Sequence, residues 1–348
     1  MAIKLSNIIF TDQDDFVPLF GEEQIVNTGI ANTLAGDDVI TGTVTQDSGT
    51  GISNIGTLNT GDGNDIVTGN GAGINSGIGN GGYIDTGDDN DIIIGINTGG
   101  DGDGITNYGG VIYGGTIDTG NGNDIIIGIA ITSGLSNSGI YNSATINTGN
   151  GNDSIISQGN FTNYGAVFLG EGNDWIIVDT DISFLGLSNY SNIIDAGDGD
   201  DIISTNVIYN DGVINTGNGD DFIIVNGGIP GSGYGIYNNG GTINTGNGND
   251  SIIANEGFKS DFNNGGSVLL GDGEDYIRGF GNNDFYGGSG NDILELTPGS
   301  YTVGTGETSV TFTKGNQLMI TSEFEQLIAG GTTYDFTSLT AGQIIIVA

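Results

Sequence analysis

Isolated aliphatic residues recur along most of this chain at fixed distances from a short segment rich in Gly and Asp. The segment reads Thr60-Gly-Asp-Gly-Asn-Asp65 in one copy and Thr245-Gly-Asn-Gly-Asn-Asp250 in another. An aliphatic residue follows the final Asp by two positions, and another apolar residue precedes it by seven. Ten copies align without gaps, ending at Asp65, Asp91, Asp124, Asp153, Asp174, Asp201, Asp221, Asp250, Asp275 and Asp292, and a degenerate copy ends at Asp38.

The spacing of these apolar residues predicts short strands on both sides of a tight turn. Side chains alternate between the two faces of a strand, so one residue from each strand can point into a common core. We expect two stacked ladders there. The ladder after the turn contains Val67, Ile93, Ile126, Ile155, Ile176, Ile203, Ile223, Ile252, Ile277 and Leu294. The ladder before the turn contains Leu58, Ile84, Ile117, Ile146, Val167, Ile194, Ile214, Ile243, Val268 and Phe285.

A polar position recurs eleven residues before the Asp. Gly or Ala follows it by two positions, and Tyr113 and Tyr190 replace it in two copies. Asn followed by Gly is typical of turns that need a positive φ. We interpret this Asn-x-Gly pattern as the other corner of each repeat. Its members are Asn54, Asn80, Asn142, Asn163, Asn210, Asn239 and Asn264.

Repeats of unequal length around a fixed core indicate a solenoid, in which each coil contacts only its neighbours. Successive Asp residues lie 17 to 33 positions apart, and the extra residues, as in 227–235, form loops. We therefore predict an all-β fold, a parallel β-roll or β-helix of about eleven coils spanning residues 33–296. Residues 1–32, with apolar Phe16, Val17, Leu19 and Phe20, form an N-terminal cap.

Residues 297–348 lack the repeat and predict a β-rich C-terminal cap. Ser309–Thr313 and Gln317–Thr321 alternate like exposed strands, and Gly315-Asn316 is a hairpin turn between them.

The composition requires a counter-charge. The 348 residues include 69 Gly, no Cys and no His, and 43 acidic residues against 4 basic ones give a net charge of −39. Self-repulsion on this scale opposes a compact state, and a bound divalent cation would relieve it. Four basic residues cannot form a nucleic-acid surface. No apolar run approaches the ~20 residues of a membrane span.

The Gly-x-Gly-x-Asp-x-aliphatic core resembles the nonapeptide of RTX (repeats-in-toxin) proteins, a calcium-binding β-solenoid repeat. Gly287-Gly-Ser-Gly-Asn-Asp292 matches that motif fully, and Asp275 and Asp284 lie nine residues apart. The resemblance implies that the sixth-position Asp binds calcium together with carbonyl groups of the turn, as suits a hard cation. The implied calcium ligands are Asp38, Asp65, Asp91, Asp124, Asp153, Asp174, Asp201, Asp221, Asp250, Asp275, Asp284 and Asp292.

The chain departs from the RTX pattern in three ways. Most coils are longer than the 18-residue coil of RTX rolls, and the first motif position is usually Thr. Asp89 replaces a Gly in the second copy, which puts the site at Asp91 in doubt. An uncalcified solenoid, with Asp and Asn as turn formers, is the alternative.

The resemblance also bears on where the protein works. RTX proteins carry an uncleaved C-terminal type I secretion signal, and residues 297–348 resemble one while also serving as a cap. Met1–Phe10 does not resemble a cleavable signal peptide. We expect an extracellular or cell-surface protein that folds when it meets calcium outside the cell.

We expect a structural component of an extracellular layer, sheath or filament, able to self-associate. The alternative is an adhesin or glycan-binding module, for which Trp175, Phe222 and Tyr276 would supply outward aromatic rings. Ice binding and polysaccharide modification are remote alternatives. We do not expect an enzyme, because His and Cys are missing and no carboxylate stands out. Lys259 and Arg278 could meet on adjacent coils, but no base accompanies them.

Overall fold

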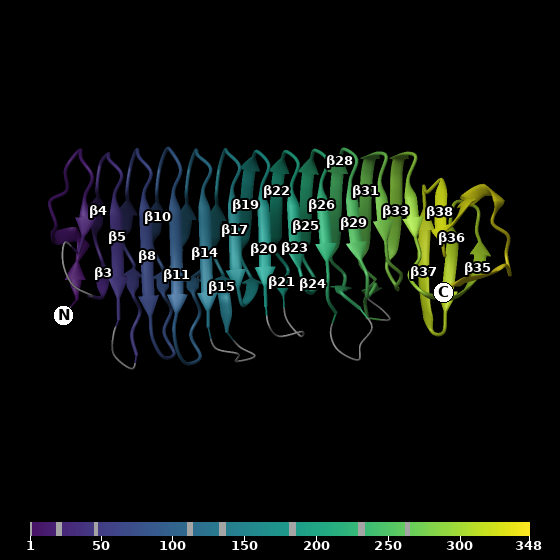
Figure 1. Cartoon of the computed structure of the whole chain (residues 1–348), viewed down its shortest axis with the longest axis horizontal. Helices are drawn as coiled ribbons and strands as arrows, with labels where there is room; N and C mark the ends of the chain where they lie inside the picture. Colours follow the sequence, from purple (N-terminus) through teal and green to yellow (C-terminus); the bar gives the residue numbers. More distant parts are fainter. Residues whose placement is uncertain are drawn as a thin grey trace. The chain divides into compact units, whose positions relative to one another are not determined.

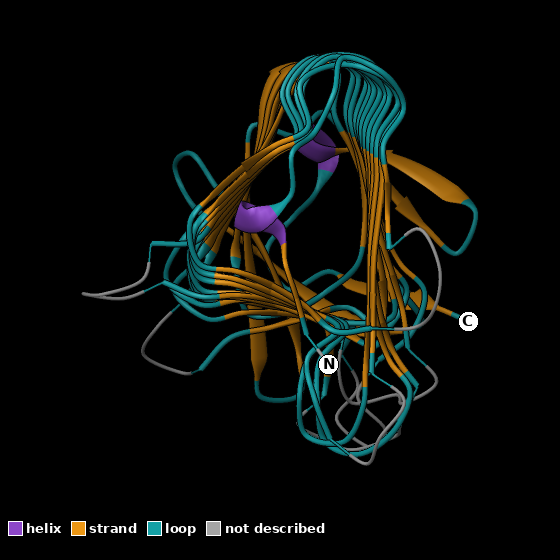
Figure 2. Cartoon of the chain, turned by 90° about the vertical axis from the view of Figure 1, so that its left-hand side faces the viewer, coloured by secondary structure: helices purple, strands orange, loops and turns teal. Residues whose placement is uncertain are grey.

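The chain folds into stacked three-stranded coils. The computed structural model describes residues 2–18, 23–44, 48–109, 114–131, 137–180, 186–228, 234–261 and 265–348, which form two compact units, Met1–Ser188 and Asn189–Ala348. Each coil contributes one strand to each of three sheets, here called A, B and C, so the strands form three sides joined by loops (Figure 2). Sheet A contains eleven strands, which confirms the prediction of a solenoid of about eleven coils.

The first unit contains three parallel sheets. Sheet A consists of β1 (Ile3–Lys4), β3 (Ile25–Asn27), β6 (Ile52–Asn54), β9 (Ile78–Asn80), β12 (Ile105–Asn107), β15 (Ser138–Asn142) and β18 (Asn160–Asn163). Sheet B consists of β2 (Phe16–Val17), β5 (Val39–Thr43), β8 (Ile66–Gly71), β11 (Ile92–Asn97), β14 (Ile125–Ala130), β17 (Ser154–Gln158) and β20 (Trp175–Asp179). Sheet C consists of β4 (Ile30–Asn32), β7 (Thr57–Asn59), β10 (Tyr83–Asp85), β13 (Thr116–Asp118), β16 (Thr145–Asn147) and β19 (Ala166–Glu171). A short 3-10 helix, η1 (Leu5–Asn7), follows β1, and β21 (Leu187–Asn189) contains the boundary between the units.

The second unit repeats this plan and ends differently. Sheet A consists of β24 (Ile208–Asn210), β27 (Ile236–Asn238) and β30 (Phe258–Lys259). Sheet B consists of β23 (Ile202–Thr205), β26 (Phe222–Val225), β29 (Ser251–Ala254), β32 (Tyr276–Arg278), β34 (Ile293–Glu295), β38 (Gln326–Ala329) and β39 (Thr332–Asp335). Sheet C consists of β22 (Ile193–Asp198), β25 (Val213–Asn218), β28 (Thr242–Asn247), β31 (Ser267–Gly273), β33 (Asp284–Gly290), β37 (Gln317–Ser322), β36 (Val310–Lys314), β35 (Gly299–Thr305) and β40 (Ile344–Val347). A 3-10 helix, η2 (Phe336–Ser338), follows β39.

The strands stack in register, so that equivalent residues of successive coils lie side by side. In sheet B, Ile93 pairs with Val67 on one side and with Ile126 on the other, and Figure 1 shows β8, β11, β14 and β17 running alongside each other. Both predicted aliphatic ladders point inward, with every member at most 1 % exposed. Burial of each such side chain contributes roughly 1.5–3 kcal/mol.

The prediction of two strands per coil was wrong, because sheet A supplies a third inward ladder. Its members lie two residues before a buried Asn, and the sequence pattern Ile-x-Asn marks them. They are Ile25, Ile52, Ile78, Ile105, Ile140, Phe161 and Leu187 in the first unit, and Ile208 and Ile236 in the second.

The asparagine corner forms a buried ladder, but part of its predicted register was wrong. Asn54 Nδ2 donates to Asn80 Oδ1 at 2.8 Å, and Asn80 Nδ2 donates to Asn107 Oδ1 at 2.9 Å. Loops of unequal length between sheets A and C shift the spacing, so the count of eleven residues fails in some coils. The ladder contains Asn27, Asn54, Asn80, Asn107, Asn142 and Asn163 in the first unit, and Asn189, Asn210 and Asn238 in the second. Asn239 lies beside it, Tyr190 follows Asn189, and Tyr113, Asn264, Leu19 and Phe20 lie outside the described residues.

The C-terminal region departs from the coil pattern as expected. β36 and β37 form an antiparallel hairpin in which Lys314 pairs with Gln317 across the turn, and Gly315 has a φ of +60°. β37 also pairs in parallel with β33, and β38 with β34, so these strands cover the last coil. At the other end, β3 and β4 lie within residues 1–32 and already pair in parallel with β6 and β7. No helix in the described part of the chain is long and apolar enough to cross a membrane.

The tight turn between sheets C and B depends on glycine, and we predict that Gly151→Ala strongly destabilises the fold. Gly151 has a φ of +141°, and an added Cβ would lie 1.4 Å from the carbonyl oxygen of Gly122 in the neighbouring coil. We expect a loss of at least about 3 kcal/mol in the free energy of unfolding, measured by urea denaturation. Gly99 is the matched control, because a Cβ there has open space. Equal losses in Gly151→Ala and Gly99→Ala would contradict this account.

Candidate functional site: a buried aspartate ladder

The final Asp of each motif lies at the start of a sheet B strand, directly after the turn from sheet C. Each is at most 2 % exposed. The glycines before it place the turns in close contact, and Asp89 adopts the same left-handed conformation as a Gly, with a φ of +83°. The Asp91 site therefore keeps its place in the series despite that substitution.

Backbone hydrogen bonds join these aspartates into a ladder in each unit. The Asp65 N–H donates to Asp91 Oδ1 at 2.8 Å, and the Asp91 N–H donates to Asp124 Oδ1 at 2.8 Å. In the second unit the Asp221 N–H donates to Asp250 Oδ1 at 2.8 Å. The carboxylate of one coil therefore fixes the turn of the coil before it. The ladder contains Asp38, Asp65, Asp91, Asp124, Asp153 and Asp174 in the first unit, and Asp201, Asp221, Asp250, Asp275 and Asp292 in the second.

The second carboxylate oxygen, Oδ2, does not take part in this series of backbone hydrogen bonds. Oδ2 is buried without a hydrogen-bond partner in nine of these residues, namely Asp38, Asp65, Asp91, Asp124, Asp153, Asp221, Asp250, Asp275 and Asp292. The motif Thr near the carboxylate does not supply one, because its hydroxyl donates to a carbonyl of the next coil, as Thr60 does to Thr86 at 3.1 Å. A buried charged oxygen without a donor is unfavourable unless a proton or a cation compensates it.

Burial has the largest effect on the ionisation of the ladder. Desolvation raises the pKa of Asp91 to about 8 and the pKa values of Asp221 and Asp275 to about 7. It raises the pKa of Asp65, Asp124, Asp153, Asp174 and Asp292 to about 6, and it also raises the pKa of Asp38 and Asp250. The folded ladder thus holds protons over a pH range in which exposed aspartates are ionised.

A second ladder, at the fifth motif position, runs in the opposite direction and is exposed. Here the N–H of a later coil donates to the side chain of the earlier coil, as Asn123 does to Asn90 Oδ1 at 2.8 Å and Asn249 to Asp220 Oδ1 at 2.7 Å. Asn and Asp alternate freely at this position, because both offer an acceptor. The sixth position, in contrast, contains Asp in every copy. Asn would also accept the backbone hydrogen bond, so the strict use of Asp points to a need for the charge or the proton on Oδ2.

Asp284 lies outside the ladder. It begins β33 and pairs with Ser267 of β31, where its side chain is partly exposed. The two basic residues predicted as possible neighbours lie on different sheets: Arg278 contacts Glu295 at 3.7 Å, and Lys259 lies over the ring of Tyr234, 4.8 Å from its centroid.

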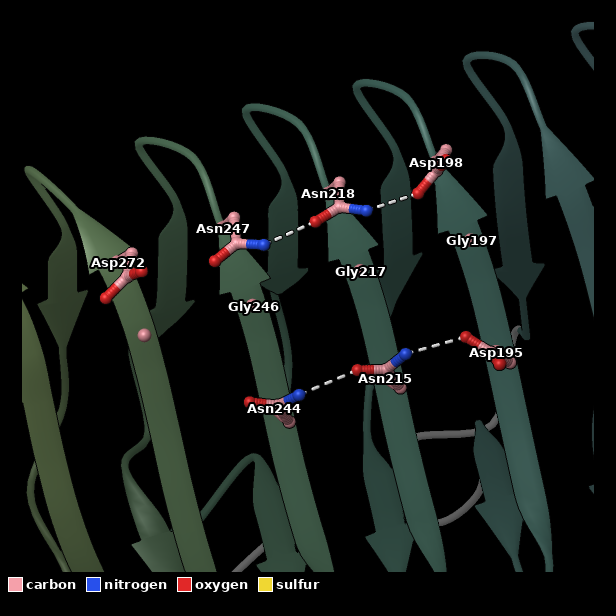
Figure 3. Close-up of a pocket in the computed structure, with 11 residues that line it drawn as sticks. Asp195, Gly197, Asp198, Asn215, Gly217, Asn218, Asn244, Gly246, Asn247 and Asp272 are labelled. Carbon is pink, nitrogen blue, oxygen red and sulfur yellow. Dashed lines mark hydrogen bonds between the residues drawn. The ribbon is translucent and has the colours of Figure 1, made fainter.

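A polar groove runs over the outer face of sheet C in the second unit. It has a volume of about 610 Å³, a floor of glycines such as Gly217, and two rows of amide and carboxylate side chains as walls (Figure 3). Asn215 Nδ2 donates to Asp195 Oδ1 at 2.7 Å, and Asn244 Nδ2 donates to Asn215 Oδ1 at 2.8 Å. A similar groove of about 400 Å³ in the first unit includes Asp85, Asp88 and Asp118. These grooves were not predicted from the sequence, although Asn or Asp just before and within the motif marks both rows.

The fold and the site together define a class: an acidic parallel β-solenoid with a buried aspartate ladder at one corner of its coils. No protein-family model and no curated protein matches the chain. The resemblance to RTX proteins therefore stays a prediction based on the motif.

Proposed function

We propose that the chain is a calcium-binding β-solenoid. The buried Oδ2 atoms carry this proposal, because they are hard anionic donors without a hydrogen-bond partner, repeated in adjacent coils. Calcium prefers oxygen ligands of this kind and would offset the repulsion between stacked carboxylates.

The residues present suit calcium because they supply oxygen ligands. Backbone oxygens or water would complete the coordination shell. Among the described residues, no group of three or more acidic side chains lies close enough to hold a metal ion alone. One or two ladder aspartates per ion, such as Asp65 and Asp91, would therefore be joined by turn carbonyls. Some of these carbonyls already accept one hydrogen bond, as Asp88 does from the Gly63 N–H, and each retains a second lone pair.

We propose further that the protein works outside the cell as a structural component of a layer, sheath or filament. At a net charge of −39 the chain would stay unfolded where calcium is scarce, and calcium at extracellular concentration would drive folding by binding the folded state. In this proposal the coils provide a rigid scaffold, and the chain has no catalytic role.

A calcium titration of the metal-stripped protein, followed by far-UV circular dichroism at neutral pH, tests the calcium proposal. We expect a cooperative transition from coil to β-structure at sub-millimolar to millimolar calcium, as is typical of extracellular calcium modules. Magnesium is the control ion, because its preference for octahedral geometry suits this site poorly. A β-spectrum that is the same with and without calcium would leave the aspartates as turn formers only.

The groove on sheet C favours a second candidate, a glycan-binding module. Its rows of Asn and Asp offer donors and acceptors at the repeat distance of the coils, about 4.8 Å, which suits a hydroxyl-rich chain. The ladder hydrogen bonds hold these side chains in place before any ligand arrives. Binding on a glycan array that is lost in Asn215→Ala but kept in Ile224→Ala would support this candidate.

A further inference from the structure

The outer face of sheet B in the first unit carries isoleucine where a solvent-facing sheet usually carries polar residues. β11 and β14 both begin Ile-Ile-Ile-Gly-Ile, so isoleucine occupies both faces of each strand. Ile93 and Ile126 point inward and are fully buried, whereas the residues on either side of them point outward and are partly exposed. We call the outward set the isoleucine face. It consists of Ile66, Ile92, Ile94, Ile96, Ile125, Ile127, Ile129, Ile156, Ile177 and the exposed Trp175.

Charge is missing from this face although the chain is strongly acidic. From β5 to β17 the outward residues of sheet B are apolar, or they are Ser, Thr, Asn or Gln; the first acidic one is Asp179, at the end of β20. The groove along sheet C and its turns in the same coils is lined by Asp62, Asp85 and Asp88. Parallel strands that are apolar on both faces are normally covered on both faces. The isoleucine face is therefore a surface for an uncharged, flat partner.

We propose that a second copy of this chain covers the isoleucine face, so that two sheets pack face to face. Two copies with a net charge of −39 repel each other at their acidic surfaces, and the isoleucine face is where that repulsion is weakest. The same charge disfavours the anionic surface of a membrane. Two such faces are self-complementary, because rows of β-branched side chains at equal strand spacing interdigitate when the sheets lie about 10 Å apart.

The area of the face limits the size of this contact. Its five strands, spaced about 4.8 Å apart and each about five residues long, cover roughly 400 Å² per copy, or about 800 Å² in total. This area is at the upper end of crystal contacts and below interfaces of standard size, as in weak complexes. A contact of this size is typical of weak complexes, so we expect a symmetric dimer with a dissociation constant on the order of ten micromolar. The dimer goes beyond the calcium proposal, since it uses outward side chains and the calcium proposal uses inward ones.

Sedimentation velocity tests the dimer, with calcium present so that the chain is folded whether or not it needs the ion. The wild-type protein should shift from monomer to dimer between about 1 µM and about 200 µM, a range that brackets the expected dissociation constant. The double variant Ile94→Asp/Ile127→Asp should stay monomeric throughout, weakening association at least tenfold, because two charges enter the centre of the contact. Both positions face outward, and an unchanged circular dichroism spectrum checks that the coils remain intact.

The matched control is the double variant Thr57→Asp/Thr116→Asp, which adds the same charge to the outer face of sheet C in the same unit. It should dimerise like the wild type. Wild-type protein that stays monomeric over the whole range would overturn the proposal. So would equal loss of dimer in both double variants, since that result would reflect net charge alone. Binding of monomers to neutral phosphatidylcholine vesicles without dimerisation would also overturn it, because it would assign the face to a lipid surface.

Discussion

The metal-stripped protein should lose stability as the pH rises from about 4 to about 8, whereas the protein in millimolar calcium should keep or gain stability over the same range. Without a cation, the folded ladder keeps its protons up to pKa values of about 6 for Asp65, about 7 for Asp221 and about 8 for Asp91. The unfolded chain releases the same protons near an ordinary pKa of 3.8. Between these limits the folded state binds more protons, so the free energy of unfolding falls as the pH rises.

The size of this effect decides whether the apoprotein folds at all. Each unit of pKa elevation corresponds to about 1.4 kcal/mol per carboxylate. Over the whole ladder the loss is at least comparable to the entire stability of a typical domain. We therefore expect the metal-stripped chain to be folded near pH 4 and largely unfolded near pH 8. Acids near the ladder strengthen the trend, among them Asp200, Asp220, Asp272, Glu323 and Glu325.

Calcium reverses the sign, because it competes with protons for the same oxygens and binds better when they are ionised. Thermal unfolding followed by circular dichroism, at several pH values with and without calcium, measures both slopes. If the midpoint of the metal-stripped protein rises between pH 5 and pH 8, the carboxylates gain a favourable partner on folding, and this account of the ladder is wrong.

Exchanging Asn and Asp between the two buried ladders should give unequal results. Asn80→Asp should lower the free energy of unfolding by at least about 3 kcal/mol. Asn80 Nδ2 donates to Asn107 Oδ1 and to the Thr116 carbonyl, both at 2.9 Å, and a carboxyl group cannot make both bonds. The variant therefore leaves a buried acceptor without its donor, and its own buried carboxyl group must be either charged or protonated.

Asp91→Asn should cost less than about 1 kcal/mol in metal-free buffer near pH 5, where the native carboxyl is already neutral. The amide keeps the acceptor for the Asp65 N–H, which lies 2.8 Å from Asp91 Oδ1. In calcium near pH 7.5 the same variant should lose part of the stabilisation by the ion. Urea denaturation of both variants under both conditions measures these differences. Similar losses in both variants without calcium would mean that the two ladders serve the same purpose.

The solenoid and its two predicted aliphatic ladders followed from the sequence because the Asp motif is rigid in length. Val67 and Leu58 keep constant distances from Asp65, since only a strand and a tight turn separate them. The third strand was missed because a loop of variable length separates it from the Asp motif, so counting back from Asp loses the register at residues such as Asn107. Anchoring the count on Ile-x-Asn, as in Ile105-Thr-Asn107, would have found sheet A.

The candidate site was predictable in its members but not in its environment. The motif identified the aspartates that form the ladder, whereas Asp284, added from the nine-residue spacing, lies in a strand of sheet C. That Oδ1 and Oδ2 differ in their surroundings depends on how coils stack, which no pattern along one coil contains. The sequence shows the isoleucine face as runs of three isoleucines. The prediction placed only alternate residues of these runs in the core and gave the outward ones no role.

The ends of the aspartate ladder are closed by groups that do not belong to the repeat. At the start, the Asp15 N–H donates to Asp38 Oδ1 at 2.7 Å, and at the finish the Asp292 N–H donates to Glu325 Oε2 at 2.8 Å. Within each unit, interior aspartates such as Asp65 and Asp221 give and receive one equivalent bond each. An in-frame duplication or deletion of one whole coil within a unit would therefore leave every donor with its acceptor. The number of coils is a property that recombination within the gene can change, while the two closing groups stay the same.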